Sequence, residues 1–68
     1  MAKMNLKAAR VNAGYTQKKA AEMLNVSNKT LCKWENGTSF PNAKKIELIC
    51  EIYDVSYDDI IFLVNNSL

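Results

Sequence analysis

The stretch TQKKAAEMLNVSNKTLCKWENG, residues 16–37, constrains the fold of this chain more than any other segment. Thr16 and Ser27 are good N-cap residues, because their side-chain oxygens accept the free N–H groups at the start of a helix. Asn25 lies between them and tolerates the left-handed backbone of a sharp turn. Gly37 stands where a glycine commonly ends a helix. The pattern predicts two short helices joined by a tight turn, over residues 17–24 and 28–36.

The second of these helices separates into two faces under the period of about 3.6 residues of an α-helix. One face is mostly apolar and carries Leu31, Trp34 and Glu35. The other face offers amides and ammonium groups, from Asn28, Lys29, Cys32, Lys33 and Asn36. Cations suit phosphates and guanine acceptors, and amides suit adenine, so the polar face has the chemistry that a DNA major groove requires. The alternative is an ordinary solvated helix face.

A known family shares this pattern. The chain resembles the helix-turn-helix domain of the phage repressor and Cro-type regulators in Thr16-Gln17, Ala20-Ala21, Leu24, Val26-Ser27, Leu31 and Trp34-Glu35-Asn36-Gly37, followed by Pro41. The resemblance covers about residues 4–64, with one departure at Asn25, where the family usually has Gly. It implies an all-α fold, a compact five-helix domain with a helix-turn-helix, which is the lambda-repressor-like DNA-binding fold.

The resemblance also implies roles for individual residues. The residues nearest the base edges of double-stranded DNA are Asn28, Lys29, Cys32 and Lys33. The residues expected at phosphates are Gln17, Ser27, Asn36 and Lys44. Arg10 and Glu35 lie on inward helix faces, where an unpaired charge is costly, and the resemblance implies a structural salt bridge between them.

The remainder of the chain is expected to complete a single domain over residues 1–68, with the end, 65–68, frayed. A first helix is predicted over 4–13, ending at Gly14. A fourth helix is expected to start after the N-cap Asn42 and to run to about Tyr53. Ser56 and Asp59 have the spacing of a capping box and predict a fifth helix.

The predicted fifth helix is apolar on every side, through Ile60, Ile61, Phe62, Leu63 and Val64. A helix that packs along one stripe buries about half of such residues, and exposed apolar patches often mark partner surfaces. These five residues are therefore predicted to form a homodimer surface, and a dimer suits a palindromic operator. The alternative is that a small core buries most of the run.

Charge is unevenly distributed along the 68 residues. All nine Lys and Arg lie in residues 1–45, opposed there by two Glu, which gives a formal charge of +7. Residues 46–68 carry five acidic and no basic residues, which gives −5. A basic part that contains the helix-turn-helix pattern indicates a polyanionic partner.

Composition excludes several classes of function. The chain has no His and two separated cysteines, so we expect neither a metal site nor a disulfide, and Cys50 is predicted to be core. No apolar run approaches a membrane span and no signal-peptide pattern opens the chain, which predicts a cytoplasmic protein. We expect no catalysis, cofactor or small-molecule ligand. The predicted function is a transcriptional regulator, a repressor of phage-related type, and the alternative is a protein-interaction or antitoxin-type module that uses the apolar, acidic C-terminal third.

Overall fold

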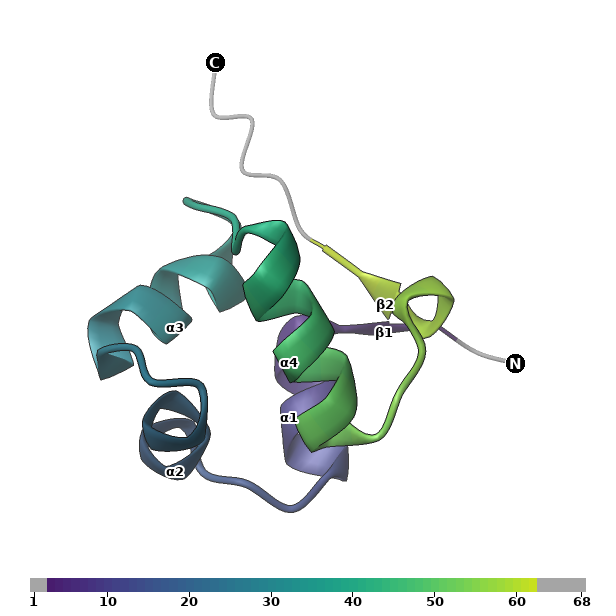
Figure 1. Cartoon of the computed structure of the whole chain (residues 1–68), viewed down its shortest axis with the longest axis horizontal. Coiled ribbons are helices and arrows are strands. Elements are labelled where there is room, and N and C mark those ends of the chain that lie inside the picture. The colour runs from purple at the N-terminus through teal and green to yellow at the C-terminus, as the bar shows by residue number, and fades with distance from the viewer. Residues whose placement is uncertain (1–2, 63–68) are drawn as a thin grey trace.

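The computed structural model describes residues 3–62, in which four α-helices pack around an apolar core (Figure 1). The elements in chain order are β1 (Met4–Asn5), α1 (Leu6–Asn12), α2 (Gln17–Met23), α3 (Asn28–Asn36), α4 (Ala43–Tyr53), a 3-10 turn (Tyr57–Asp59) and β2 (Ile60–Ile61). In the view of Figure 1, α2 and α3 form the left side of the molecule, and the paired strands lie to the right of α4. Within residues 3–62, no helix has the length and apolar character needed to cross a membrane.

Each α-helix begins at a residue whose side chain accepts a backbone N–H from the first turn. Three of the caps predicted from the sequence are confirmed, at Thr16, Ser27 and Asn42. The cap of α1 is Asn5, whose Oδ1 accepts the N–H of Ala8 at 2.8 Å. The predicted first helix therefore began too early, because the residues from Met4 to Asn5 are extended.

The turn between α2 and α3 has the geometry that the sequence predicts. Asn25 has a φ of 58°, in the left-handed region, and the N–H of Val26 donates to the carbonyl of Ala21 at 3.0 Å. Gly37, with a φ of 79°, ends α3. Because a side chain makes the left-handed conformation costly, Gly and Asn are the residues that suit these two positions.

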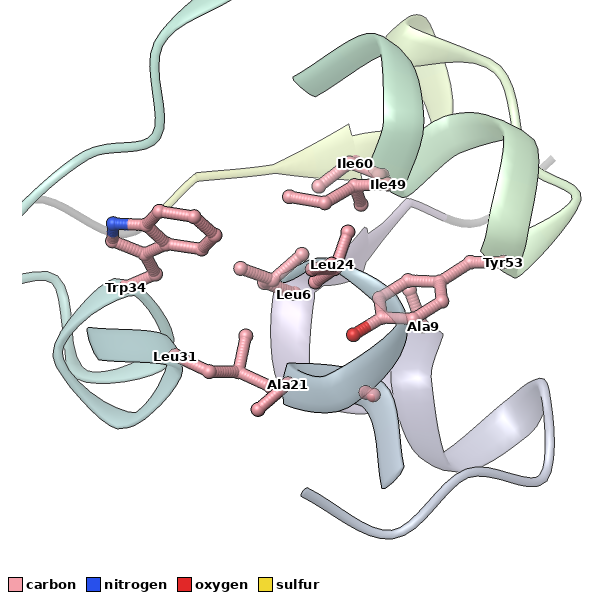
Figure 2. Packing of buried hydrophobic residues seen from close by; sticks show 10 residues of the cluster. Leu6, Ala9, Ala21, Leu24, Leu31, Trp34, Ile49, Tyr53 and Ile60 are labelled. Atoms are coloured by element: carbon pink, nitrogen blue, oxygen red, sulfur yellow. The ribbon is translucent and has the colours of Figure 1, made fainter. Parts of the chain in front are cut away.

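The core gathers apolar residues from all four helices and from β2 (Figure 2). Its members are Leu6, Ala9, Ala20, Ala21, Leu24, Leu31, Trp34, Ile49, Tyr53 and Ile60. Trp34 is only 7% exposed, so its predicted inward position is confirmed. The small side chains of Ala20 and Ala21 lie under α3 and allow the two helices of the motif to approach closely. Cys50, predicted to be core, is half-buried at the margin of the cluster.

The predicted fifth helix is wrong. The chain after α4 makes one 3-10 turn and then becomes extended. Ser56 does not cap a helix, because its hydroxyl donates to Asp59 Oδ2 at 2.9 Å and accepts no backbone N–H. The serine–aspartate spacing that resembled a capping box thus closes a single turn.

A short parallel strand pair takes the place of that helix. Met4 lies opposite Ile60 and Asn5 opposite Ile61. Both isoleucines are β-branched and suit extended backbone, and Ile60 reaches the core at 7% exposure. The pair ties the two ends of the described chain together, so the fold is four helices plus a two-stranded sheet rather than five helices.

Candidate nucleic-acid interface

α3 presents its polar face to solvent and its apolar face to the core, as its periodicity predicts. The exposed residues of this helix include Asn28, Lys29, Lys33 and Asn36, and Cys32 is half-buried between them. The inward residues are Leu31, Trp34 and Glu35, all buried. The four residues predicted to read bases therefore lie together on one face of a single helix.

A buried ion pair holds α3 against α1. Arg10 Nε donates to Glu35 Oε2 at 2.7 Å, and the two side chains are 9% and 4% exposed. Arg10 Nη1 also donates to the carbonyl of Tyr15 at 2.8 Å, in the loop that precedes α2. The guanidinium of Arg10 thus attaches both ends of the helix-turn-helix segment to α1. It also neutralises the Glu35 carboxylate, which lies in the low-dielectric interior.

Gln17 connects this buried pair to the surface of α3. Its Nε2 donates to Glu35 Oε1 at 3.1 Å, and its Oε1 accepts from Asn28 Nδ2 at 3.1 Å. An ionised carboxylate can only accept hydrogen bonds, so the amide group of Gln17 must face Glu35 and its oxygen must face Asn28. This order leaves Asn28 Oδ1 and one Nδ2 hydrogen free at the exposed end of α3.

The sequence did not predict this connection. It predicted that Gln17 contacts a phosphate and that Glu35 forms a salt bridge. The two residues lie 18 positions apart and on different helices. The sequence held one local indication of this contact. Gln17 lies in the first turn of α2, and the tight turn after α2 brings the start of α3 back beside it. The meeting of the two side chains is a tertiary contact that periodicity does not reveal.

The four residues predicted to contact phosphates differ in their exposure and in whether their polar atoms are already hydrogen-bonded within the protein. Lys44 is exposed in the first turn of α4, and Asn36 is exposed at the end of α3, where its Nδ2 lies 3.5 Å from Cys32 Sγ. Gln17 is half-buried and already engaged through both ends of its amide. The hydroxyl of Ser27 caps α3 and donates its proton to Thr30 Oγ1 at 2.9 Å, so it has no proton to offer a phosphate.

Exposed charge is unevenly distributed over the molecule. Five of the seven exposed lysines among residues 3–62 lie on α2, on α3 and at the start of α4, at Lys18, Lys19, Lys29, Lys33 and Lys44, and the other two are Lys3 and Lys7. Apart from Glu22 on α2, the exposed carboxylates of residues 3–62 lie farther along α4 and in the segment that follows, at Glu47, Glu51, Asp54 and Asp58. The polar face of α3 therefore belongs to the more basic part of the surface, and α2 and α3, which carry four of these lysines, are on the left in Figure 1.

The residues predicted as a dimer surface do not share one face. Ile60 is buried, Ile61 is 48% exposed and Phe62 is half-buried, because an extended strand sends successive side chains in opposite directions. Leu63 and Val64 lie outside the described residues, as does the segment 65–68 that was predicted to fray.

A different apolar surface is open beside α4. A groove there is lined by Ala43, Ile46, Glu47, Cys50 and Tyr57. Tyr57 is 59% exposed, and its ring lies 6.0 Å from that of Phe62 between centroids. Burial raises the pKa of the Cys50 thiol, so this cysteine stays protonated at neutral pH.

Tyr53 projects from α4 into the core (Figure 2) and is buried. Burial raises its pKa to about 12; the negative charge of Glu35 adds to this shift and Arg10 opposes it. Its ring stacks on Tyr15 with centroids 6.2 Å apart. Among residues 3–62, its hydroxyl is a buried side-chain polar atom without a hydrogen-bond partner.

Comparisons with known proteins agree with this geometry. Residues 6–60 match the family described as Helix-turn-helix. The regulator ImmR of Bacillus subtilis, described as an HTH-type transcriptional regulator, is 43% identical over 53 residues, which are 78% of this chain and 42% of that protein. The antitoxin PezA of Streptococcus pneumoniae is 37% identical over 57 residues, which are 84% of this chain and 36% of that protein.

A third relative is BcrR of Enterococcus faecalis, described as an HTH-type transcriptional activator. It is 32% identical over 56 residues, which are 82% of this chain and 28% of that protein. The chain thus spans less than half the length of each of these three relatives. No solved structure matches the chain. The family match extends over α1 to α4 and includes the motif from Thr16 to Gly37, so the chain belongs to the helix-turn-helix family of the phage repressor and Cro type.

Proposed function

We propose that this chain is the DNA-reading part of a transcriptional regulator and that α3 enters the major groove of double-stranded DNA. The observation that carries the proposal is the exposed face of α3, whose first residue is held by Gln17 against a buried ion pair. A reading helix needs side chains of fixed orientation, because ordering them on binding costs free energy. The relatives named as transcriptional regulators support the same reading.

The chemistry of each side chain gives it a partner on the DNA. Asn28 has a free acceptor and a free N–H, the pair that adenine N6 and N7 require. Lys29 and Lys33 can donate to guanine O6 and N7, and the half-buried thiol of Cys32 is of a size to contact a thymine methyl group.

Phosphate contacts fix the position of the domain on the duplex without reading sequence. We assign these contacts to Lys44 and Asn36, and to the region around Gln17 at the start of α2. For Ser27, whose hydroxyl is committed to Thr30, the contribution is the N-cap that fixes the start of α3.

We further propose that the protein binds a palindromic operator as a homodimer and represses by occluding the promoter. Two copies would place their reading helices in successive major grooves, roughly 34–36 Å apart. The apolar surface beside α4, with exposed Tyr57, supports a protein–protein contact outside the reading face.

A selection from a random pool of duplexes tests the DNA-binding proposal and identifies the preferred sequence. We expect Lys29→Ala to lower affinity for the selected duplex by roughly 1–3 kcal/mol and to change affinity for random duplexes much less. Lys7→Ala is the matched control, because Lys7 is an exposed lysine on α1 and is not among the residues proposed to contact DNA. Equal losses for selected and random duplexes in Lys29→Ala would remove this residue from the base-reading set.

A second candidate function is a protein-binding module of the antitoxin kind. The apolar groove beside α4 and the likeness to a protein named as an antitoxin favour it. Co-purification of a stoichiometric partner, together with failure to select any preferred duplex, would favour this function over DNA reading.

A further inference from the structure

Lys45 is a lysine whose ammonium group is used inside the fold. Its Nζ donates to the backbone carbonyl of Leu24 at 2.7 Å. Lys45 lies in the first turn of α4 and is half-buried, whereas the adjacent Lys44 is exposed. Among the side chains of residues 3–62, no other lysine ammonium makes a hydrogen bond.

The carbonyl of Leu24 is a position where a cation has a defined effect. Leu24 is the C-cap residue of α2, at the end where carbonyl groups lack helical partners and carry the negative end of the helix dipole. The next residue, Asn25, has the left-handed backbone that starts the turn into α3. The ammonium group of Lys45 therefore binds the backbone at the turn between α2 and α3.

This contact is also the sole hydrogen bond, within the described part of the chain, that joins α4 to the segment 16–37. On the other side, Arg10 attaches the same segment to α1. The helix-turn-helix is thus hydrogen-bonded to a cation of each neighbouring helix, and the bond from Lys45 adds a directional contact with α4 to the apolar packing of the core.

We propose that Lys45 is a positioning residue for DNA recognition and does not contact DNA itself. It fixes the turn of the motif against the first turn of α4, so that base contacts by α3 and a phosphate contact by Lys44 are made at the same time. This inference rests on the proposed function, because it concerns how two sets of DNA contacts are kept in register.

The test compares Lys45→Met with Lys44→Met, which remove the same charge from adjacent positions. Binding to the selected duplex and to random duplexes is measured over a salt series, for variants shown to be folded by circular dichroism. We expect Lys45→Met to weaken the selected duplex about tenfold, with random duplexes and their salt dependence unchanged. Lys44→Met should weaken both kinds of duplex and should reduce the slope of log K against log salt by about 0.9, the value for one phosphate contact.

Two results would overturn the proposal. If Lys45→Met reduces the salt slope as Lys44→Met does, Lys45 binds a phosphate directly. If Lys45→Met binds both kinds of duplex as the wild type does, the attachment has no role in recognition. Lys45→Arg retains a donor and a cation, so it should restore preference for the selected duplex, and it serves as the second variant if Lys45→Met fails to fold.

A measurement without DNA separates this proposal from the function on which it rests. The ¹³C chemical shift of the Leu24 carbonyl in the full chain should move in Lys45→Met and stay close to wild type in Lys44→Met. An unchanged shift in Lys45→Met means that the contact is absent in solution and refutes the inference. A wild-type protein that selects no duplex refutes the proposed function instead, and the role of Lys45 in recognition falls with it.

Discussion

Gln17 is the residue that fixes the orientation of the Asn28 side chain at the exposed start of α3. Its amide is fixed at one end by Glu35 and fixes Asn28 at the other. Removal of that amide leaves Asn28 free to rotate, so its donor and acceptor are no longer presented in a set order. The same substitution leaves the ion pair between Arg10 and Glu35 in place.

We therefore expect Gln17→Leu to relax discrimination at the base that Asn28 is proposed to read, by roughly 1 kcal/mol of the 1–3 kcal/mol that a good base contact provides. Affinities for duplexes that differ at this single base measure the effect. In a double-mutant cycle, Gln17→Leu should cost little further discrimination once Asn28 is replaced by Ala. Fully additive losses would show that the two amides act independently.

The hydroxyl of Tyr53 is buried and has no hydrogen-bond partner among residues 3–62. A buried hydroxyl without a partner costs about 1–3 kcal/mol of desolvation, and the ring packing of Tyr53 does not depend on it. We expect Tyr53→Phe to raise the free energy of unfolding at pH 7 by about 1 kcal/mol, as measured by urea denaturation. A loss of stability would mean that the hydroxyl has a partner in solution, such as a bound water.

The same tyrosine predicts a dependence of stability on alkaline pH. Its pKa is raised to about 12 in the folded protein, from the model-compound value of 10.0 that applies to the unfolded chain. Between these values the unfolded state loses the phenol proton and the folded state keeps it. Stability should fall as pH rises from about 10 to 12. Because lysines also titrate there, the test is the difference between wild type and Tyr53→Phe, which should grow in favour of Tyr53→Phe over this range.

At the scale of the helices, the ion pair between α1 and α3 is the attachment whose loss should cost most. Glu35→Ala leaves Arg10 buried and unpaired, so we expect the free energy of unfolding to fall by about 3–5 kcal/mol. Glu22→Ala, at an exposed carboxylate of α2, is the control and should change stability by no more than about 0.5 kcal/mol. Equal midpoints of thermal unfolding for the two variants would contradict a buried pair.

The strand pair makes a second prediction at this scale. Ile60 and Ile61 are adjacent and identical in chemistry, but only Ile60 packs into the core. Ile60→Ala should destabilise the fold by about 2–5 kcal/mol, and Ile61→Ala by about 0.5 kcal/mol. Urea denaturation of the two variants tests whether Ile60, and not Ile61, packs into the core.

The elements differ in how far the sequence predicts them, and the reason is the range of the interactions that form them. The caps at Thr16, Ser27 and Asn42 and the turn at Asn25 depend on neighbours within a few residues, so local chemistry identifies them. The pairing of Met4 with Ile60 spans most of the chain. No local pattern distinguishes that strand from a short apolar helix, and the predicted fifth helix failed for this reason.

The features of the candidate site also differ in how far the sequence predicts them, for the same reason. Helical periodicity alone places Asn28, Lys29 and Lys33 on one exposed face, and inward charges alone suggest a pair between Arg10 and Glu35. The bonds that join Gln17 to Glu35 and Lys45 to Leu24 connect different helices. They depend on the packing angles of those helices, which the sequence pattern does not contain.

On the scale of the whole molecule, exposed charge and exposed apolar surface occupy different places. Most exposed lysines lie on α2, on α3 and at the start of α4, and most exposed carboxylates lie farther along α4, where Glu47 lines the apolar groove, and in the segment after it. A duplex carries a dense negative charge, so it is attracted to the first region and repelled by the second. This arrangement favours one orientation of DNA on the protein and leaves the groove free for a protein partner.

Salt dependence tests this arrangement for the molecule as a whole. If several lysines meet phosphates, log K for wild-type binding should fall steeply with log salt, by about 0.9 for each phosphate contact. Glu51→Gln, on the acidic side, should leave that slope unchanged, because Glu51 lies outside the proposed contact surface. A slope near zero for wild type would mean that the basic region does not bind the DNA backbone.

The central claim, that the polar face of α3 meets duplex DNA, is tested most directly by NMR. ¹⁵N-labelled protein is titrated with the selected duplex and the amide shifts are mapped. We expect the largest shifts at Asn28, Lys29 and Lys33 and in the first turn of α2, with small shifts around Glu51 and Tyr57. Shifts confined to the groove side of α4, with α3 unperturbed, would contradict the account.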